Sequence, residues 1–224
     1  MASSKDQEER TKKIVEYYKK VADDYDRDYD APYWKEIYDK ITWAFIEPYL
    51  PQQGQALDAG GGTGKWSIPL AKRGLHVTLL DISKEMLAVA DAKVKKEGLQ
   101  ELVTIKEGDI RKLDFPSNSF DFVLAVGDAV SYCWDGDQAI TELTRVLKPS
   151  SHIVVSVDSV YPLMIRRVVG DLDFDAAVRF LTERKFEVGG AGFESRAFNP
   201  EELRELLEKN GLEVLKIIGK PVYL

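Results

Sequence analysis

The amino-acid sequence predicts one α/β domain built on a doubly wound, mainly parallel β-sheet with helices on both faces. Short apolar strands alternate with amphipathic helices from Gln55 onward, which is typical of βαβ units. Residues 120–126 are almost continuously apolar, as a central strand covered on both faces requires. The 224 residues correspond to one domain with an elaboration, at about 150 residues per domain.

The expected elements follow one another in βαβ order. We expect strands at residues 55–59, 75–80, 102–106, 120–126, 152–157 and 212–218, and helices at residues 5–20, 64–73 and 83–97. A further helix begins at the N-cap Asp135 and ends before Pro149. The last helix has Asn199 as N-cap, Pro200 at its first position and Gly211 after its end.

Composition and charge exclude several classes of protein. With 44% hydrophobic residues the chain can bury a core, so global disorder is excluded. The 31 Lys and Arg against 38 Asp and Glu give a net charge of −7, so no global positive field attracts nucleic acid or anionic lipid. The single Cys133 and two histidines predict no metal site. Residues 1–13 are hydrophilic and no run of about 18 apolar residues occurs, so we expect a cytoplasmic protein without membrane spans.

Two segments depart from the alternating pattern. Ten of the 23 aromatic residues lie within residues 17–49. They either cover a ligand or pack helices onto the core, and the sequence supports both interpretations about equally. Residues 158–198 form an insertion over the carboxyl edge of the sheet, where long insertions usually shape a site.

A glycine run marks the predicted cofactor site. The sequence DAGGGTG at residues 58–64 stands where the first strand turns into its helix, and its glycines let the backbone approach a bound nucleotide. Asp81 ends the second strand, 19 residues beyond Gly62, where a carboxylate accepts hydrogen bonds from a ribose diol. Together these residues predict a cofactor that contains a nucleoside.

The spacing distinguishes between cofactors. A dinucleotide-binding Gly-x-Gly-x-x-Gly pattern fails, because its last position is Lys65 when counted from Gly60 and Ser67 when counted from Gly62. Asp58 would be poorly placed beside a pyrophosphate but suits a cofactor with an ammonium group, such as S-adenosylmethionine. A nicotinamide-dependent oxidoreductase and a non-catalytic cofactor-binding module stay open as alternatives.

On these motifs the chain resembles the class I S-adenosylmethionine-dependent methyltransferases of the small-molecule type, and it is close in pattern to the quinone-biosynthesis methyltransferases. The matching stretches are residues 56–67, 77–83, 107–115, 119–133, 142–157 and 198–217. The resemblance implies the Rossmann-like methyltransferase fold, S-adenosylmethionine as cofactor and methyl transfer to a small molecule. Residues 1–224 would form one methyltransferase domain, with a helical lid at 1–50 and a substrate-side insertion at 158–198.

The resemblance also implies roles for individual residues. The implied cofactor-binding residues are Tyr25, Asp58, Gly60, Gly62, Gly64, Asp81, Ile82, Asp109, Ile110 and Gly127. Asp58 and the glycines would cradle the methionine part, and Asp81 would hold the ribose hydroxyls. Asp109 would accept a hydrogen bond from the adenine amine, and Tyr25 would close over the cofactor. Gly127 and Asp128 would lie beside the sulfonium.

The predicted acceptor side has fewer signals. Methyl transfer depends mainly on alignment and a dry pocket, and Asp128 is the best-placed carboxylate to act as a base, with Tyr132 as a hydrogen-bonding positioner. No Asn-Pro-Pro-Tyr or Pro-Cys sequence follows the fourth strand, which argues for a small acceptor and against nucleic acid. Arg166 and Arg167 are the only adjacent arginines and would meet an anionic acceptor, and Tyr29 is a further predicted substrate contact.

The end of the sequence predicts a gap in the sheet. Proteins that this chain resembles have a seventh, antiparallel strand between the fifth and sixth, and residues 219–224 are too few to supply it. We therefore expect either a fragment of a longer chain or a gap filled by another segment. The candidates are a hairpin at residues 186–198 and a neighbouring subunit.

Overall fold

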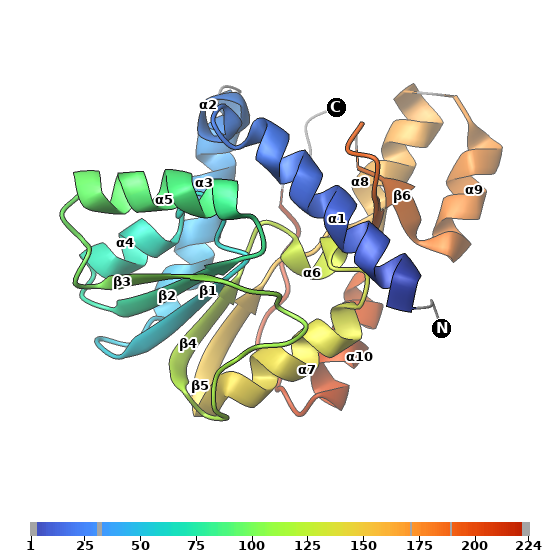
Figure 1. Cartoon of the computed structure of the whole chain (residues 1–224). Helices are drawn as coiled ribbons and strands as arrows, with labels where there is room; N and C mark the ends of the chain where they lie inside the picture. The colour runs from blue at the N-terminus through green and yellow to red at the C-terminus, as the bar shows by residue number, and fades with distance from the viewer. Residues whose placement is uncertain (1–3, 31–32, 171, 189, 221–224) are drawn as a thin grey trace.

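The computed structural model describes residues 4–30, 33–170, 172–188 and 190–220 and is organised around a five-stranded parallel sheet (Figure 1). The strand order is β3-β2-β1-β4-β5, and all four pairings are parallel. The strands are β1 (Gln55–Ala59), β2 (His76–Asp81), β3 (Val103–Glu107), β4 (Phe120–Ala125) and β5 (Leu147–Val155). The predicted doubly wound α/β architecture is therefore confirmed.

Helices flank the sheet and extend beyond its carboxyl edge. Along the chain they are α1 (Ser4–Val21), α2 (Tyr25–Asp30), α3 (Tyr33–Ile46), the 3₁₀ turn η1 (Glu47–Tyr49), α4 (Ser67–Lys72), α5 (Lys84–Lys96), α6 (Ala129–Tyr132), α7 (Gly136–Val146), α8 (Val160–Ile165), the π-helical turn η2 (Arg166–Gly170), α9 (Phe174–Glu183) and α10 (Pro200–Lys209). A separate short sheet contains β6 (Lys185–Glu187) and β7 (Glu194–Arg196).

Two hydrophobic cores lie on opposite faces of the sheet. Side chains alternate between the faces of a strand, so Leu57 of β1 packs with α7 and α10 while its neighbour Ala56 packs with α3, α4 and α5. The same alternation divides Phe122 from Val123 on β4. All four residues are fully buried. Strands covered on both faces explain why the predicted strands read as continuous apolar runs.

The predicted helix caps are present. Asp135 accepts a hydrogen bond from the Gln138 N–H at 3.0 Å, at the start of α7. Asn199 and Glu202 form a reciprocal capping box at the start of α10, with Pro200 in the first turn. Each cap satisfies backbone N–H groups that have no partner inside the helix, which is why these short sequences predicted both starts correctly.

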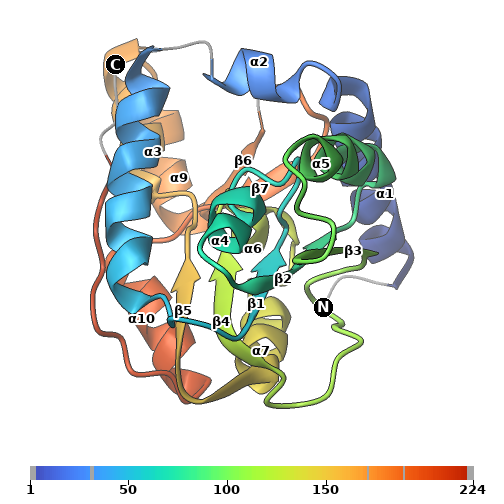
Figure 2. The same ribbon diagram turned by 90° about the vertical axis from the view of Figure 1, so that its left-hand side faces the viewer.

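The predicted strand at 212–218 is wrong. Residues 212–220 continue from α10 in a conformation that pairs with no strand of the described part of the sheet. In Figure 2 this segment rises beside α3 on the way to the C-terminus. A cavity of about 1060 Å³ separates it from β5. Leu212 packs on the core that includes α10, and Lys216 Nζ lies 5.8 Å from the centre of the Phe45 ring of α3, so the segment packs on helices without a strand partner.

The predicted hairpin within 186–198 forms, but it does not fill this gap. β6 and β7 pair antiparallel with each other, and Phe186 lies opposite Ser195. The turn is closed by the Val188 N–H, which donates to the Phe193 carbonyl oxygen at 3.1 Å. The pair lies at the carboxyl edge beside α8 and α9, so no described antiparallel strand joins the main sheet (Figure 1).

Candidate active site

The glycine run forms a tight loop between β1 and α4. Gly60, Gly62 and Gly64 have φ values of +76°, +53° and +80°, a region that favours glycine. The N–H groups of Gly60 and Gly61 both donate to the Leu80 carbonyl oxygen, at 2.7 and 3.1 Å. A side chain at Gly60 would bring its Cβ to 2.6 Å from the Cβ of Ala129. The loop therefore leaves an open cradle only because these positions lack side chains.

Asp81 holds this loop at the end of β2. One carboxylate oxygen accepts from the Gly62 N–H at 2.9 Å, and the other accepts from the Ser83 N–H at 2.9 Å. Burial raises the pKa of the Asp81 carboxyl, and the backbone N–H groups oppose that shift. Asp81 and Ile82 line a cavity under the loop, where the sequence predicted the ribose.

Asp58 lies behind the loop and not in the cavity wall. Its side chain is fully buried, and its Oδ2 accepts from the Ser67 hydroxyl at 2.6 Å. Its Oδ1 has no hydrogen-bond partner among the described residues. Burial raises the pKa of the Asp58 carboxyl to about 7. Neither Asp58 nor Gly64 lines the cavity, so their contact with a methionine part stays a prediction.

The cavity of about 120 Å³ under the glycine loop gathers most of the predicted cofactor residues. The predicted cofactor-binding residues in its wall are Tyr25, Gly60, Gly62, Asp81, Ile82, Asp109, Ile110 and Gly127. Tyr132, predicted as a positioner of the acceptor, lines the same cavity. α1 closes the opposite side with Thr11, Ile14 and Tyr18. Segments that lie more than a hundred residues apart in the sequence, such as Thr11 and Trp134, thus meet over the carboxyl ends of β1, β2 and β4 (Figure 1).

Sequence reasoning missed Arg111, which occupies the predicted adenine end. Its Nε lies 2.9 and 3.0 Å from the two carboxylate oxygens of Asp109, and its guanidinium also donates to Thr11 at 3.0 Å. The guanidinium stacks 4.4 Å from the centre of the Trp134 ring. Arg111 therefore links α1 to the loop after β3, and the contact of Asp109 with adenine stays a prediction.

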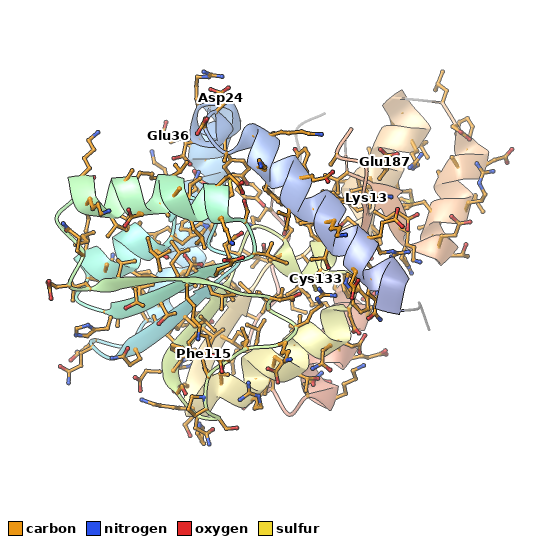
Figure 3. The ribbon with its side chains drawn as sticks, viewed as in Figure 1. Lys13, Asp24, Glu36, Phe115, Cys133 and Glu187 are labelled. Atoms are coloured by element: carbon orange, nitrogen blue, oxygen red, sulfur yellow. The ribbon has the colours of Figure 1, made fainter. Side chains whose placement is uncertain are left out.

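Cys133 is the remaining reactive side chain in the cavity wall. Figure 3 shows it inside the molecule, whereas Asp24 and Glu36 lie at the outer end of the helical segment. Burial raises the pKa of the Cys133 thiol to about 12, and its Sγ donates to the Val130 carbonyl oxygen at 3.4 Å. A thiol in this state is a packing residue and not a nucleophile.

The N-terminal helices are fastened to the glycine loop. The Thr63 hydroxyl donates to Asp26 at 2.6 Å, and the Lys93 ammonium of α5 lies 2.6 Å from the same carboxylate. Lys65 and Asp39 form a second link at 2.6 Å. These contacts hold α2 beside the cofactor cavity, which Tyr25 lines, and tie α3 to the same loop, while a lid at 1–50 stays a prediction.

Asp128 begins α6, just beyond the end of β4. Its backbone is left-handed, with φ +64°, and its Oδ1 accepts from the Ser156 hydroxyl at 2.7 Å. Ser156 also accepts the N–H groups of Gly127 and Asp128, at 3.0 and 3.2 Å. Asp128 lines the larger cavity beside β5 rather than the cavity under the glycine loop. Tyr132 lies near it, and burial and then the Asp128 charge raise the pKa of that phenol.

Asp158 is a second carboxylate that sequence reasoning missed. Its Oδ2 accepts from the Ser195 hydroxyl at 2.9 Å, and its N–H donates to the Ser131 hydroxyl at 2.9 Å. Burial and then the nearby Asp128 raise the pKa of the Asp158 carboxyl to about 7. The signal was present, because Asp158 directly follows the predicted strand at 152–157 and so lies at the same sheet edge as Asp128.

The other predicted substrate residues lie elsewhere. The Arg167 guanidinium is 5.7 Å from the centre of the Phe180 ring and lines neither cavity. The side chains of Tyr29 and Arg166 are outside the described residues. Within the described ranges, no group of three or more His, Cys, Asp or Glu side chains is placed to hold a metal ion. None of the described helices has the length and apolar character needed to cross a membrane.

Comparison with known proteins supports the same cofactor chemistry. Residues 56–150 match the family model described as a methyltransferase domain. A phosphatidylethanolamine N-methyltransferase from Cereibacter sphaeroides is 37% identical over 102 residues, which cover 46% of this chain and 49% of that protein. A demethylmenaquinone methyltransferase from Anoxybacillus flavithermus is 32% identical over 154 residues, covering 66% of this chain and 63% of that protein.

A solved structure and the extent of these matches complete the comparison. An S-adenosylmethionine-dependent methyltransferase from Methanosarcina mazei superposes with a TM-score of 0.60 at 28% identity, covering 74% of this chain and 82% of that one. The chain spans about half to two thirds of the length of the curated relatives it matches. These matches give no support to a nicotinamide-dependent enzyme. The chain thus contains a methyltransferase domain at residues 56–150 and is similar to class I S-adenosylmethionine-dependent methyltransferases.

Proposed function

We propose that this protein transfers the methyl group of S-adenosylmethionine to a small-molecule acceptor by in-line displacement. One observation carries the proposal: the cavity under the glycine loop and the larger cavity beside β5 share a lining residue, Val126, just beyond the end of β4. A donor in the first cavity and an acceptor in the second would face each other across this residue. Displacement at carbon needs that opposed arrangement and little else from the protein.

The described residues fit the cofactor. Gly60 and Gly62 leave a cradle that a side chain would fill, and Asp81 lines the cavity with a carboxylate that a ribose diol can share. S-adenosylmethionine supplies a methyl group that its positive sulfur makes electrophilic. The contribution of the chain is then to hold the nucleoside, to exclude water with α1 and α2, and to fix the acceptor beside Asp128.

The likeness to named relatives leaves the acceptor open. By their names, one relative methylates the nitrogen of phosphatidylethanolamine and another acts on demethylmenaquinone. The family model matches residues 56–150 and does not extend to residues 158–220, which line much of the cavity beside β5. The proposal therefore includes residues 158–198 as the part that shapes the acceptor site and residues 1–50 as the lid.

The proposal extends to the setting of the reaction. The net charge of −7 supports a small molecule and not a nucleic acid as the partner. The single cysteine, with its buried thiol, fits the reducing conditions of the cytoplasm.

Two measurements test the proposed function. Calorimetry should show that S-adenosylhomocysteine binds and that NAD does not. Incubation with labelled S-adenosylmethionine and fractions of a metabolite extract should then move the label to a small molecule. Binding of NAD in preference to S-adenosylhomocysteine would overturn the cofactor, and cofactor binding without transfer to any fraction would favour a non-catalytic module.

A further inference from the structure

Two carboxylates from neighbouring strands form a pair in the wall of the cavity beside β5. Ala125 pairs with Val155, and continuing that offset past the strand ends sets Asp128 opposite Asp158. Each carboxylate uses one oxygen to accept from a serine, and the other oxygen, Oδ2 of Asp128 and Oδ1 of Asp158, makes no hydrogen bond within the described residues. Both residues line the cavity. Two acceptor oxygens are thus left for a ligand.

Three tyrosines lie near enough to Asp128 to feel its charge. Burial raises the pKa of the phenols of Tyr25, Tyr38 and Tyr132, and in all three the next cause is the charge of Asp128. Tyr38 comes from α3, Tyr25 from α2 and Tyr132 from α6, so three elements converge on one carboxylate. Of the three, Tyr38 lines the cavity beside β5, and the face of such a ring attracts a cation.

The chain already places one ammonium group in this surrounding. Lys220 Nζ is shielded from solvent, lies 4.0 Å from the centre of the Tyr38 ring and has no hydrogen-bond partner among the described residues. Burial lowers the pKa of Lys220, and the charges of Asp128 and Asp39 oppose that shift. An organic ammonium is therefore compatible with the volume and the rings of this region.

We propose that the methyl acceptor is a small protonated amine, bound between Asp128 and Asp158 at the inner end of the cavity beside β5. This inference rests on the proposed function and names its substrate class. The Asp128 charge raises the pKa of the nearby Asp158, and a cation bound beside the two carboxylates offsets that repulsion. Arg167, predicted to meet an anion, does not line the cavity and gives no support to that alternative.

The carboxylate pair can also accept the proton that the amine must lose before methyl transfer. A protonated amine has no free lone pair, so one N–H proton passes to a carboxylate, for which Asp158 is suited because its pKa is raised to about 7. The neutral nitrogen then forms the new N–C bond while the S–C bond breaks and its electron pair stays on sulfur. The product is a methylated ammonium, the sulfur becomes a neutral thioether, and Asp158 releases its proton to water.

Three probes that differ in charge test the inference by binding. Benzylamine, benzyl alcohol and benzoate share a ring and carry a positive, no and a negative charge. Ligand-observed NMR with the full chain saturated with S-adenosylhomocysteine should show benzylamine binding about tenfold or more tightly than the other two. Three outcomes would overturn the inference. They are equal binding of all three probes, a preference for benzoate, and no binding of benzylamine at concentrations of about tens of millimolar.

Matched variants assign the preference to the pair. Asp158→Asn keeps an oxygen for Ser195 and should weaken benzylamine about tenfold while leaving benzyl alcohol unchanged. Asp128→Asn should act in the same direction. Asp114→Asn removes a carboxylate that is 98% exposed and should change nothing. An Asp158→Asn variant that binds benzylamine as the unaltered chain does would refute the assignment.

The outcome is separable from that of the proposed function. Asp158 does not line the cavity under the glycine loop, so Asp158→Asn should keep the thermal shift produced by S-adenosylhomocysteine, which also shows that the variant is folded. If the unaltered chain does not bind S-adenosylhomocysteine, the proposed function is wrong. The preference for benzylamine can still be measured by NMR on the protein without cofactor, so the two failures are distinguishable.

Discussion

Replacing Asp81 with alanine is the sharpest test of the cofactor site, because this carboxylate holds the glycine loop and is also the proposed ribose ligand. It anchors the glycine loop by accepting from the N–H groups of Gly62 and Ser83, both at 2.9 Å. In the proposed function it also accepts from the ribose diol. Asp81→Ala should therefore lower the stability of the free protein and, separately, weaken cofactor binding.

The size of each effect follows from the hydrogen bonds lost. Removing a charged acceptor from two backbone N–H groups should destabilise the free protein by about 2–4 kcal/mol. Losing two charge-assisted bonds to the diol should cost about 2.7 kcal/mol of binding, or a hundredfold in Kd. At a ligand concentration of about 100 times the original Kd, the stabilisation falls from about 2.7 to about 0.4 kcal/mol. For a chain of this length the thermal shift falls from about 5–11 °C to about 1–2 °C.

The assay is the melting temperature with and without S-adenosylhomocysteine, compared as a difference for each variant. Asp121→Ala is the matched control, because Asp121 accepts from the Gln55 N–H at 2.9 Å and from Lys148 at 2.7 Å at the opposite end of the sheet. It should lower the melting temperature of the free protein but keep the full shift. An unchanged shift in Asp81→Ala would refute Asp81 as the ribose ligand.

Three further changes test the loop, the buried carboxylate and the N-terminal helices. Gly60→Ala should abolish S-adenosylhomocysteine binding because its Cβ would meet Ala129 at 2.6 Å, whereas Gly74→Ala, with similar φ and open space, should only cost about 1 kcal/mol in urea unfolding. Asp58 has a folded pKa of about 7 against 3.8 unfolded, so the folded state holds a proton that the unfolded chain releases between those values. Relative to Asp58→Asn, the unaltered chain should therefore lose about 1 kcal/mol of stability per pH unit as pH rises from 5 to 7, and a flat difference would contradict this. Asp26→Ala should speed proteolysis within residues 17–34 of the free protein, and S-adenosylhomocysteine should slow that cleavage; rates independent of both would show that these helices are not a lid.

The parts of the fold predicted well are those fixed by short-range physics. β1 has the predicted bounds, Gln55–Ala59, because a buried strand ends where its glycine turn begins. Asp135 and Asn199 cap helices as expected, since each cap is a contact within three residues. β5 was predicted to begin at His152 but begins at Leu147, because pairing with β4 resumes across an irregularity in register that no local pattern reveals.

The predicted sixth strand is wrong for the same reason, because strand pairing depends on segments distant in the sequence. The apolar residues at 212–218 predict that the segment is partly covered, and Leu212, Val214, Ile217 and Ile218 are half-buried while Leu215 is exposed. It does not say whether the backbone has a partner strand, which depends on what lies beside β5. There the structure has a cavity of about 1060 Å³, and the segment packs on α3 and α10 instead.

The acceptor side of the site was harder to predict than the cofactor side because it depends on register between distant segments. The glycine loop and Asp81 belong to one βαβ unit, so their spacing in the sequence is nearly their spacing in the fold. Asp128 and Asp158 are 30 residues apart and meet only because β4 and β5 pair with that offset. Ser195, from the inserted hairpin, then fixes the second carboxylate. A rule that pairs the first carboxylates beyond neighbouring parallel strands would have found both, and it uses nothing but the strand ends that the sequence already predicts.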